Sequence, residues 1–351
     1  MSKCSQVSGA PTAKTVQSAS IIANVPSWSP YRRTDMTLRN AVSVRRYGLQ
    51  IGTFAMALAL WTVFAVGAPE TWLHFDIYSA LMSTVPLTGI IALALTLVVV
   101  AREIDLSFGS VMAVGAWVFV SVGQPELGLL AGLAAGLGVG LLNGLIVVRF
   151  GVPSLVATIG TWFFWGGIVV WRTKGVGAGT DFAHGFVQSL ITGRVRGVPA
   201  EFFWMVGIAT VLWVVLNRGR FGAHVYLVGD NEQSARMMGV RTDIVRVTVF
   251  ALVGLAAAFT GIASTLENNY FWPTVGSGAM LPTVAAVFLG GTSIFGGRGT
   301  IFGTFVGAFV IGAIEPGLVS IGWTGLLTQV IYGAVIVGAL IMQAFVLRRV
   351  R

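Results

Sequence analysis

The side chains that usually catalyse reactions or bind metals are few and scattered in this sequence. Cys4 is the only cysteine, so the chain forms no internal disulfide and offers no cysteine metal site. The histidines His74, His184 and His224 are far apart and show no ligand spacing. No grouping of serine, histidine and aspartate, or of cysteine and histidine, indicates a catalytic site. The sequence therefore predicts neither a metal site nor a cofactor, and it gives no support to catalysis.

A glycine-rich run at residues 290–299, GGTSIFGGRG, must be tested for phosphate binding. A P-loop cradles phosphates with its backbone N–H groups and needs a Gly-Lys-Ser/Thr sequence at its end. The chain has only Lys3, Lys14 and Lys174, and none of them lies in that pattern. We therefore expect a tight turn between two helices here, and no ATP-binding motif.

The longest polar run between apolar segments covers residues 217–246, NRGRFGAHVYLVGDNEQSARMMGVRTDIVR. Its charged side chains are Arg218, Arg220, Asp230, Glu232, Arg236, Arg241, Asp243 and Arg246. A charge at the centre of a bilayer costs about 2.5–3.5 kcal/mol even on insertion scales. The run must therefore lie outside the membrane, and its excess of arginine favours the cytoplasmic side.

Within this run the sequence predicts a helix of about two turns. Asp230 or Asn231 can cap its N-terminus, with Gln233 at capping-box spacing from Asp230. Glu232 lies in the first turn, where the helix dipole favours a carboxylate, and Gly239 is a natural stop. The helix is either a solvated connector or a docking element for a cytoplasmic partner.

A second polar interruption, residues 102–107 (REIDLS), separates two apolar runs. Its three charges are tolerated only at the surface or where water or protein partners reach them. Two interpretations remain open: a cytoplasmic turn with a local arginine–glutamate pair, or a broken helix beside a translocation path. In the second, Asp105 and Ser107 shape the path or its gate, and Asn143 is a weaker candidate to face it. Asp105 could instead cap the following helix by accepting backbone N–H groups near Ser107 and Phe108.

The rest of the sequence is strongly apolar: of 351 residues, 55% are hydrophobic and 10% charged, and the mean hydropathy is +0.84. Soluble domains carry about 25% charged residues. Runs of suitable length for a bilayer predict about ten spans at residues 49–68, 77–101, 107–122, 127–148, 152–171, 199–216, 244–266, 281–294, 301–320 and 325–347. We predict an all-α polytopic membrane protein with about ten transmembrane helices, some of them short or broken.

The sequence also predicts how the chain is divided and oriented. Residues 1–47 have no long apolar run and are expected to form a disordered cytoplasmic tail, followed by a transmembrane domain at 48–351. With the N-terminus inside and the spans alternating, eighteen of the 22 Lys and Arg lie on the cytoplasmic side, as do both termini. The four exceptions lie in or beside residues 172–198, a loop that could be partly inserted. These orientation signals explain the net charge of +9 better than nucleic-acid binding does.

Glycine is abundant, with 46 residues, and several recur at every fourth position: Gly128, Gly132, Gly136, Gly140 and Gly144. Residues four apart share one face of a helix. Small residues at this spacing let helices approach closely in membranes. We expect Gly132, Gly136, Gly140 and Gly144 to pack one helix against another.

At three of these segments the chain resembles the permease subunits of ATP-binding-cassette importers for monosaccharides, the ribose/xylose/arabinose/galactose branch. Residues 104–110 (IDLSFGS) are similar to the family's IDLSVGS. Residues 228–239 (VGDNEQSARMMG) resemble its GGNxxAARLSGI segment, and residues 287–299 (VFLGGTSIFGGRG) resemble its VLGGTSLxGGxG segment. The departures are Phe108 for Val, Asp230 for Gly, and Met237-Met238 for Leu-Ser. They leave the substrate open.

The resemblance implies a permease that carries a monosaccharide or related polyol across the bacterial inner membrane. It implies a second permease subunit, identical or different, and a periplasmic sugar-binding protein on the outer side. A cytoplasmic ATPase would bind the predicted short helix and hydrolyse ATP there. The residues expected at that coupling site are Gly229, Asn231, Glu232, Ala235, Arg236 and Gly239.

Two other classes remain as alternatives. An ATP-independent secondary transporter or channel would use intramembrane ionisable groups, for which the candidates are Glu103, Asp105, Glu267 and Glu315. A membrane-bound enzyme or an assembly scaffold is the third class. Neighbouring genes for an ATPase with two nucleotide sites and for a secreted sugar-binding protein would separate the three.

Overall fold

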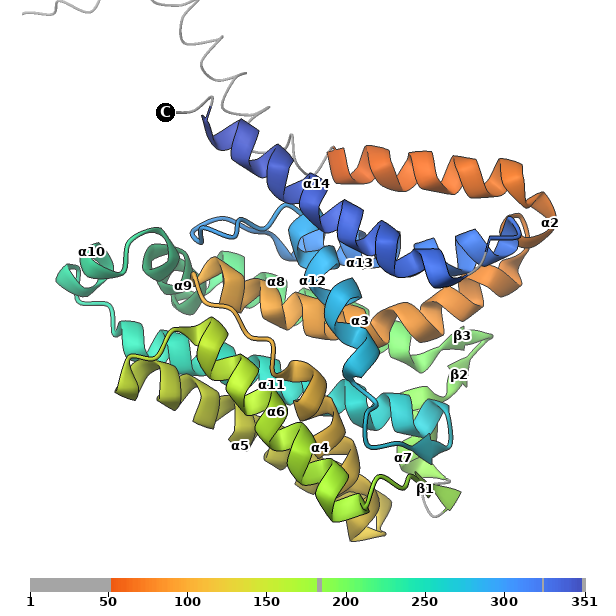
Figure 1. Ribbon diagram of the computed structural model, residues 1–351, viewed down its shortest axis with the longest axis horizontal. Helices are drawn as coiled ribbons and strands as arrows, with labels where there is room; N and C mark the ends of the chain where they lie inside the picture. The colour runs from red at the N-terminus through yellow and green to blue at the C-terminus, as the bar shows by residue number, and fades with distance from the viewer. Residues whose placement is uncertain (1–51, 182–184, 324, 349–351) are drawn as a thin grey trace, which may run out of the picture. The chain divides into compact units, whose positions relative to one another are not determined.

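The computed structural model describes residues 52–181, 185–323 and 325–348. The tail predicted at residues 1–47 and His184 lie outside these residues. Six described helices are long and apolar enough to cross a membrane: α3 (Phe75–Val100), α5 (Pro125–Phe150), α6 (Ser154–Thr173), α8 (Ala200–Arg218), α11 (Thr242–Glu267) and α13 (Ile301–Ser320). Shorter apolar helices are Gly52–Gly67, α4 (Phe108–Val122) and α12 (Met280–Leu289), and α14 (Thr328–Arg348) contains a shorter apolar stretch, Thr328–Ala339. Each predicted span overlaps one of these helices, which confirms an all-α polytopic membrane protein (Figure 1).

Several short elements connect the long helices. They are α2 (Pro69–Trp72), α7 (Phe186–Thr192), α9 (Arg220–Asp230), α10 (Glu232–Met237), η2 (Ser277–Ala279) and η3 (Gly325–Leu327). Two antiparallel strand pairs join β1 (Ala178–Gly179) to β4 (Tyr270–Phe271) and β2 (Arg194–Val195) to β3 (Val198–Pro199). In the loop at residues 172–198, α7 buries Val187 and Ile191 against Phe119 and Leu266. This part of the loop therefore packs on protein.

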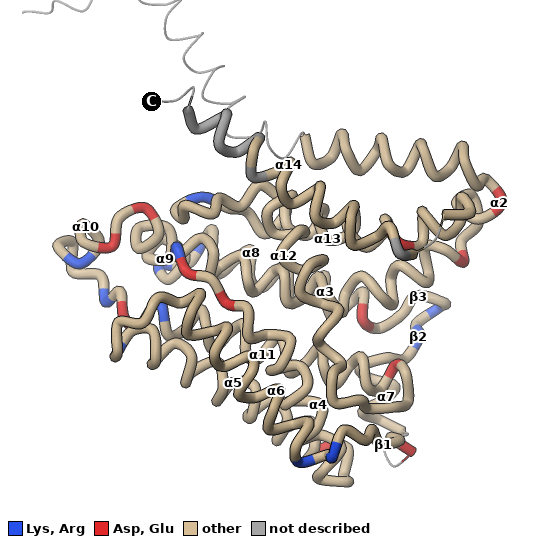
Figure 2. The backbone as a smooth tube through the Cα atoms, viewed as in Figure 1, with Lys and Arg blue, Asp and Glu red and all other residues tan. Residues whose placement is uncertain are grey.

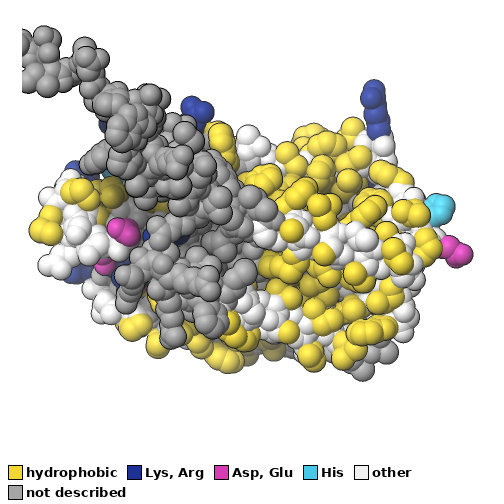
Figure 3. All heavy atoms as spheres, turned by 90° about the horizontal axis from the view of Figure 1, so that it is seen from above, with side chains coloured by type: hydrophobic (Ala, Val, Ile, Leu, Met, Phe, Trp, Pro, Cys, Tyr) yellow, Lys and Arg dark blue, Asp and Glu magenta, His cyan; other side chains and the backbone are white. Residues whose placement is uncertain are grey.

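Helix α3 lies at the centre of the described helices. It packs against α8, α11, α12 and α13, and its C-terminal half is buried almost without interruption. In contrast, α6 and α8 expose large apolar side chains such as Phe163, Trp171 and Val211. Figure 3 shows a further face, over the helix Gly52–Gly67 and α14, on which hydrophobic side chains gather. Such apolar faces are suited to contact with lipid or with a second membrane subunit, because exposing them to water is unfavourable.

The charged residues of the described chain lie mostly near the ends of the helices and in their connections (Figure 2). Segments that the sequence assigns to one side of the membrane also lie together in space. Gly297 donates its N–H to the carbonyl oxygen of Val100 (2.9 Å), which joins two connections predicted to be cytoplasmic. The side chains of Gln188 and Asn269 hydrogen-bond at 2.8 Å and join two connections predicted on the opposite side. These contacts agree with alternating spans.

The glycine-rich face of α5 lies against α11 and α4. A Cβ on Gly136 would lie 2.5 Å from the carbonyl oxygen of Gly254, and one on Gly144 would lie 2.7 Å from the Cα of Val247. A Cβ on Gly132 would lie 2.6 Å from the carbonyl oxygen of Gly115 in α4. The backbones approach so closely that a side chain at these positions would have to push the helices apart.

We expect Gly140→Ala to lower the melting temperature of the detergent-purified protein. The added methyl would lie 2.5 Å from the carbonyl oxygen of Phe250, and overpacking of this kind costs about 1–3 kcal/mol. Gly138→Ala is the matched control on the same helix, because a Cβ there has nothing within 4 Å. Equal melting temperatures for the two variants would contradict close packing at Gly140.

Candidate coupling and translocation site

Two of the three segments that carry the family resemblance meet at the end of α3, just before the third segment begins. Gly229, at the end of α9, packs so tightly on the end of α3 that a Cβ would overlap the carbonyl oxygen of Val100. The Gly297 N–H donates to the same carbonyl oxygen at 2.9 Å. The hydroxyl of Tyr226 in α9 donates to the carbonyl oxygen of Gly299 at 2.8 Å. The end of α3, the end of α9 and the glycine-rich run therefore form one junction.

The glycine-rich run is a tight turn between α12 and α13, as the sequence predicts. Gly296 and Gly297 adopt φ angles of +78° and +68°, a region in which a side chain would be strained. A Cβ on Gly296 would also lie 2.7 Å from the carbonyl oxygen of Gly229. Thr300 then starts α13 by accepting the N–H of Gly303 at 3.0 Å. The glycines allow the turn to touch α9.

Helix α10 is the short helix predicted within the polar loop. Asn231 caps it, since the Asn231 Oδ1 accepts the N–H of Ser234 at 2.9 Å. Asp230, the other predicted cap, instead ends α9, a helix that the sequence analysis missed. Gly239 follows α10 with φ +81°. Ala235 is fully buried and seats α10 on the protein, so it faces away from any partner.

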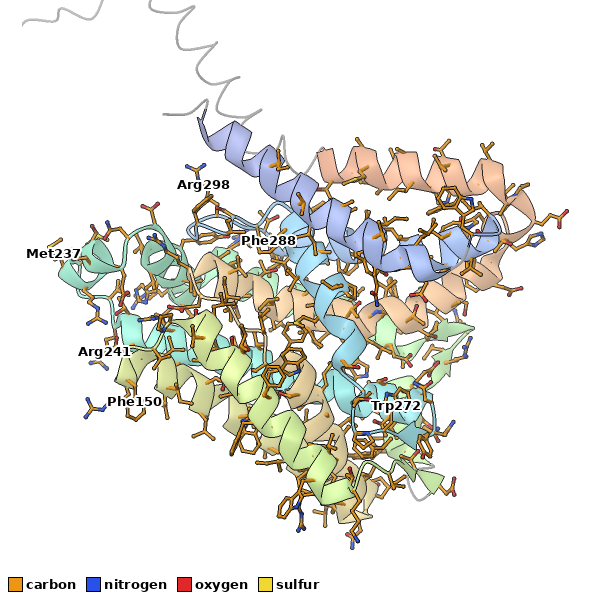
Figure 4. The ribbon with its side chains drawn as sticks, in the orientation of Figure 1. Phe150, Met237, Arg241, Trp272, Phe288 and Arg298 are labelled. Carbon is orange, nitrogen blue, oxygen red and sulfur yellow. The ribbon has the colours of Figure 1, made fainter. Side chains whose placement is uncertain are left out.

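The outer end of α10 carries two exposed methionines that the sequence analysis noted only as departures from the family pattern. Met237 is 77% exposed and Met238 is 61% exposed, and Figure 4 shows Met237 at the far tip of this loop. Methionine is flexible and polarizable, which suits a surface that binds another protein. An exposed apolar pair on a water-facing loop is therefore a candidate docking point.

Arg236 forms one ion pair within α10 and one with the start of α11. Arg236 Nη2 lies 2.9 Å from Glu232 Oε1 and 2.7 Å from Asp243 Oδ1. These three side chains are well exposed, between 39% and 55%. Exposed pairs of this kind contribute little to stability.

A deeper ion pair joins α11 to the linker between α3 and α4, residues 101–107. Arg246 Nη2 lies 2.5 Å from Glu103 Oε1, and the two side chains are only 17% and 9% exposed. Arg246 also reaches Glu232 on α10, at 3.5 Å. The local arginine–glutamate pair considered for the linker is therefore wrong: the partner of Glu103 is Arg246, and Arg102 is exposed.

The three residues proposed for the translocation path form one buried chain of hydrogen bonds. Asp105 Oδ1 accepts the Ser107 N–H at 2.8 Å and the Ser107 hydroxyl at 2.7 Å. Asn143 in α5 donates from Nδ2 to the Ser107 hydroxyl oxygen at 2.7 Å. All three side chains are at most 1% exposed. The chain therefore ties the linker and the start of α4 to α5.

Asp105 lies in the linker, outside the helices. Burial raises the pKa of its carboxyl to about 6, and the hydrogen bonds from Ser107 act in the opposite direction. Its Oδ1 accepts the N–H of Ser107, the residue just before α4, which is one of the contacts that the capping interpretation expects.

Other ionisable residues differ in their surroundings. Glu267 and Glu315, proposed for an ion-driven alternative, are not fully buried. Glu201 near the start of α8 is 2% exposed, and neither of its carboxylate oxygens has a hydrogen-bond partner within the described part of the chain. The sequence analysis did not single out Glu201, although it lies within the span predicted at residues 199–216.

We expect Asp105→Asn to reach the membrane and to function nearly normally, because asparagine keeps the oxygen that accepts from Ser107. Asp105→Ala removes that acceptor and leaves the buried N–H and hydroxyl of Ser107 without it. We expect this to lower the free energy of unfolding by about 1–3 kcal/mol. Membrane level and solute uptake are measured for both variants in parallel. Normal level with lost uptake in Asp105→Asn would show that the charge itself is required.

A bundle of apolar helices with a polar loop at one end is typical of the membrane-spanning subunits of transporters. Residues 77–340 match the family described as branched-chain amino acid transport system / permease component. The chain belongs to this permease family, which confirms the class inferred from the three motifs. It is a multi-pass membrane protein and a transport subunit.

Individual relatives agree with this assignment. The ribose import permease of Bacillus subtilis is 36% identical over 263 residues, which cover 73% of this chain and 81% of that protein. The ribose import permease of Escherichia coli K12 is 31% identical over 80% of this chain and 88% of that protein. The fructose import permease of Rhizobium meliloti is 32% identical over 70% of this chain and 73% of that protein. No solved structure matches the chain significantly.

Proposed function

We propose that this chain is the translocating subunit of an ATP-driven importer for a monosaccharide or related polyol. Family membership and the names of its relatives, which include ribose and fructose import permeases, support the transport class and the substrate class. The observation that carries the proposal is a set of contacts around the motif segments: α9 and the glycine-rich turn meet at the end of α3, and Arg246 pairs with Glu232 of α10 and Glu103 of the α3–α4 linker. These contacts link a water-facing helix, α10, to the polar break between two buried helices, α3 and α4.

The partners follow from the two ends of the spanning helices. A cytoplasmic ATP-binding-cassette ATPase would bind α10, with Glu232, Arg236 and the exposed methionines at its surface. Gly229, Asn231, Ala235 and Gly239 would shape and seat α10. A periplasmic sugar-binding protein would dock at the opposite end, near α7 and the short strand pairs. A second permease subunit would cover part of the exposed apolar surface, and both termini would be cytoplasmic.

We expect uptake of a labelled monosaccharide into proteoliposomes that hold the permease, its ATPase and its binding protein. Uptake should require ATP and continue in the presence of a proton uncoupler, because hydrolysis and not an ion gradient drives it. The isolated chain should bind no ATP, since its glycine-rich turn lacks the phosphate-binding lysine. Loss of uptake on addition of the uncoupler, at constant ATP, would favour the secondary-transporter alternative.

We expect Met237→Asp to leave insertion of the permease unchanged and to weaken its association with the ATPase. A charged side chain at an apolar contact that excludes water costs about 2 kcal/mol or more, which corresponds to more than tenfold in affinity. Met237→Leu is the matched control, because it keeps an apolar side chain of similar volume. The amount of ATPase that copurifies with the permease is the measurement, and equal amounts for both variants would remove Met237 from the contact.

A further inference from the structure

Arg246 is the side chain through which three elements of the structure are joined. It comes from the second turn of α11 and lies between two carboxylates of other elements. One is Glu103 of the α3–α4 linker, at 2.5 Å, and the other is Glu232 of α10, at 3.5 Å. The Arg246 Nε atom has no hydrogen-bond partner within the described residues. Arg246 thus bridges the proposed ATPase-binding helix and the linker.

Stability alone does not explain a buried bridge of this kind. Taking two charges out of water costs several kcal/mol per ion, and an apolar replacement is often as stable. The arginine fork can hold two carboxylates at the same time with a fixed separation. Its special property is therefore geometric, because it sets the distance between Glu103 and Glu232.

The linker connects Glu103 to the buried hydrogen-bonded cluster of Asp105, Ser107 and Asn143. Glu103 lies two residues before Asp105, which binds Ser107 at the start of α4. Ser107 in turn accepts a hydrogen bond from Asn143 in α5. A displacement of Glu103 along the linker must therefore shift or strain the contacts that hold α4 to α5.

The Glu232 carboxylate contacts two arginines at the same time. Its Oε1 lies 2.9 Å from Arg236, within α10 itself, and 3.5 Å from Arg246. The longer contact is the weaker one, so small movements of α10 can exchange Glu232 between the two arginines. An element with two discrete arrangements is what energetic coupling between distant sites requires.

We propose that Arg246 is a positioning residue that transmits movement of α10 to the α3–α4 linker by bridging Glu232 and Glu103. The inference rests on the proposed function, because it assigns α10 to the ATPase contact. It goes beyond the proposed function because it identifies Arg246 as the charged residue that connects the ATPase-binding helix to the α3–α4 linker. The linker moves with α10 while Arg246 holds both carboxylates, and it is released when Glu232 pairs with Arg236 alone.

The test uses the complete reconstituted complex of permease, ATPase and binding protein. Glu103→Gln and Arg246→Gln should each assemble with the ATPase and keep its basal hydrolysis. Each should lower the stimulation of hydrolysis by sugar-loaded binding protein at least about fivefold, the lower end of typical coupling between sites. The double variant should be no worse than either single variant, because both changes break the same contact.

Two further variants separate transmission from a merely structural role. Arg246→Lys keeps the positive charge and should recover part of the stimulation, as should Glu103→Asp, which keeps a shorter carboxylate. Arg149→Gln is the matched control, because Arg149 is an exposed arginine at the end of α5 with no partner shown in the described structure. It should be stimulated like the wild type.

Full stimulation in Glu103→Gln would overturn the inference, and so would losses that multiply in the double variant. Loss of ATPase assembly in the glutamine variants, without recovery in Arg246→Lys, would also overturn it in favour of a structural role. A wild-type complex without ATP-dependent uptake would instead overturn the proposed function and this inference with it. The two failures are therefore distinguishable.

Discussion

Polar backbone that is buried between helices must find its hydrogen-bond partners within the protein, because an unpaired buried N–H or C=O group is costly. The linker between α3 and α4 satisfies this constraint with side chains from its neighbours. Ser154 and Thr158 of α6 accept the N–H groups of Ile104 and Leu106 at 3.1 and 3.2 Å. Within the linker, the carboxylate of Asp105 accepts the N–H of Ser107. The positions of α4, α5, α6 and α11 around this break therefore follow from the need to satisfy it.

Close backbone contact is the second requirement of the same region. The glycines of α5 let α11 and α4 approach it, and Gly229 lets α9 rest on the end of α3. Larger residues would separate these helices and lengthen the hydrogen bonds and ion pairs that join them. Small residues at the interfaces let the helices approach closely. The polar side chains at the helix break can form their hydrogen bonds and ion pairs only at these short distances between helices.

The sequence predicts the spans well because each is a long apolar run, and length with composition is what the bilayer selects. It also predicts the turn at residues 290–299 and the helix α10, since glycine, asparagine and glutamate act there through local geometry. The partner of Glu103 could not be predicted. Arg246 lies far along the chain, and nothing in the residues around either of them indicates the other. Only the packing of α11 beside α3 brings them together.

For the same reason, Asp105, Ser107 and Asn143 could be proposed as a group but not as a hydrogen-bonded chain. Their polarity within apolar surroundings marks them, whereas the contact between Ser107 and Asn143 depends on the register of α4 against α5. The missed helix α9 shows the opposite case. Its residues are polar enough to resemble a loop, and it is helical because Val225 and Val228 bury one of its faces.

The charged residues between α10 and the linker become less exposed step by step. The side chains of Arg236, Glu232, Arg246 and Glu103 are 54%, 39%, 17% and 9% exposed. Water screens the outer contacts, so exchanging partners there changes the free energy little. Separating the innermost pair would leave a charge buried without a partner, which is costly. In the proposed coupling, a force applied at α10 while Arg246 holds both carboxylates displaces Arg246 and Glu103 as a unit, and exchange of Glu232 to Arg236 alone ends the transmission.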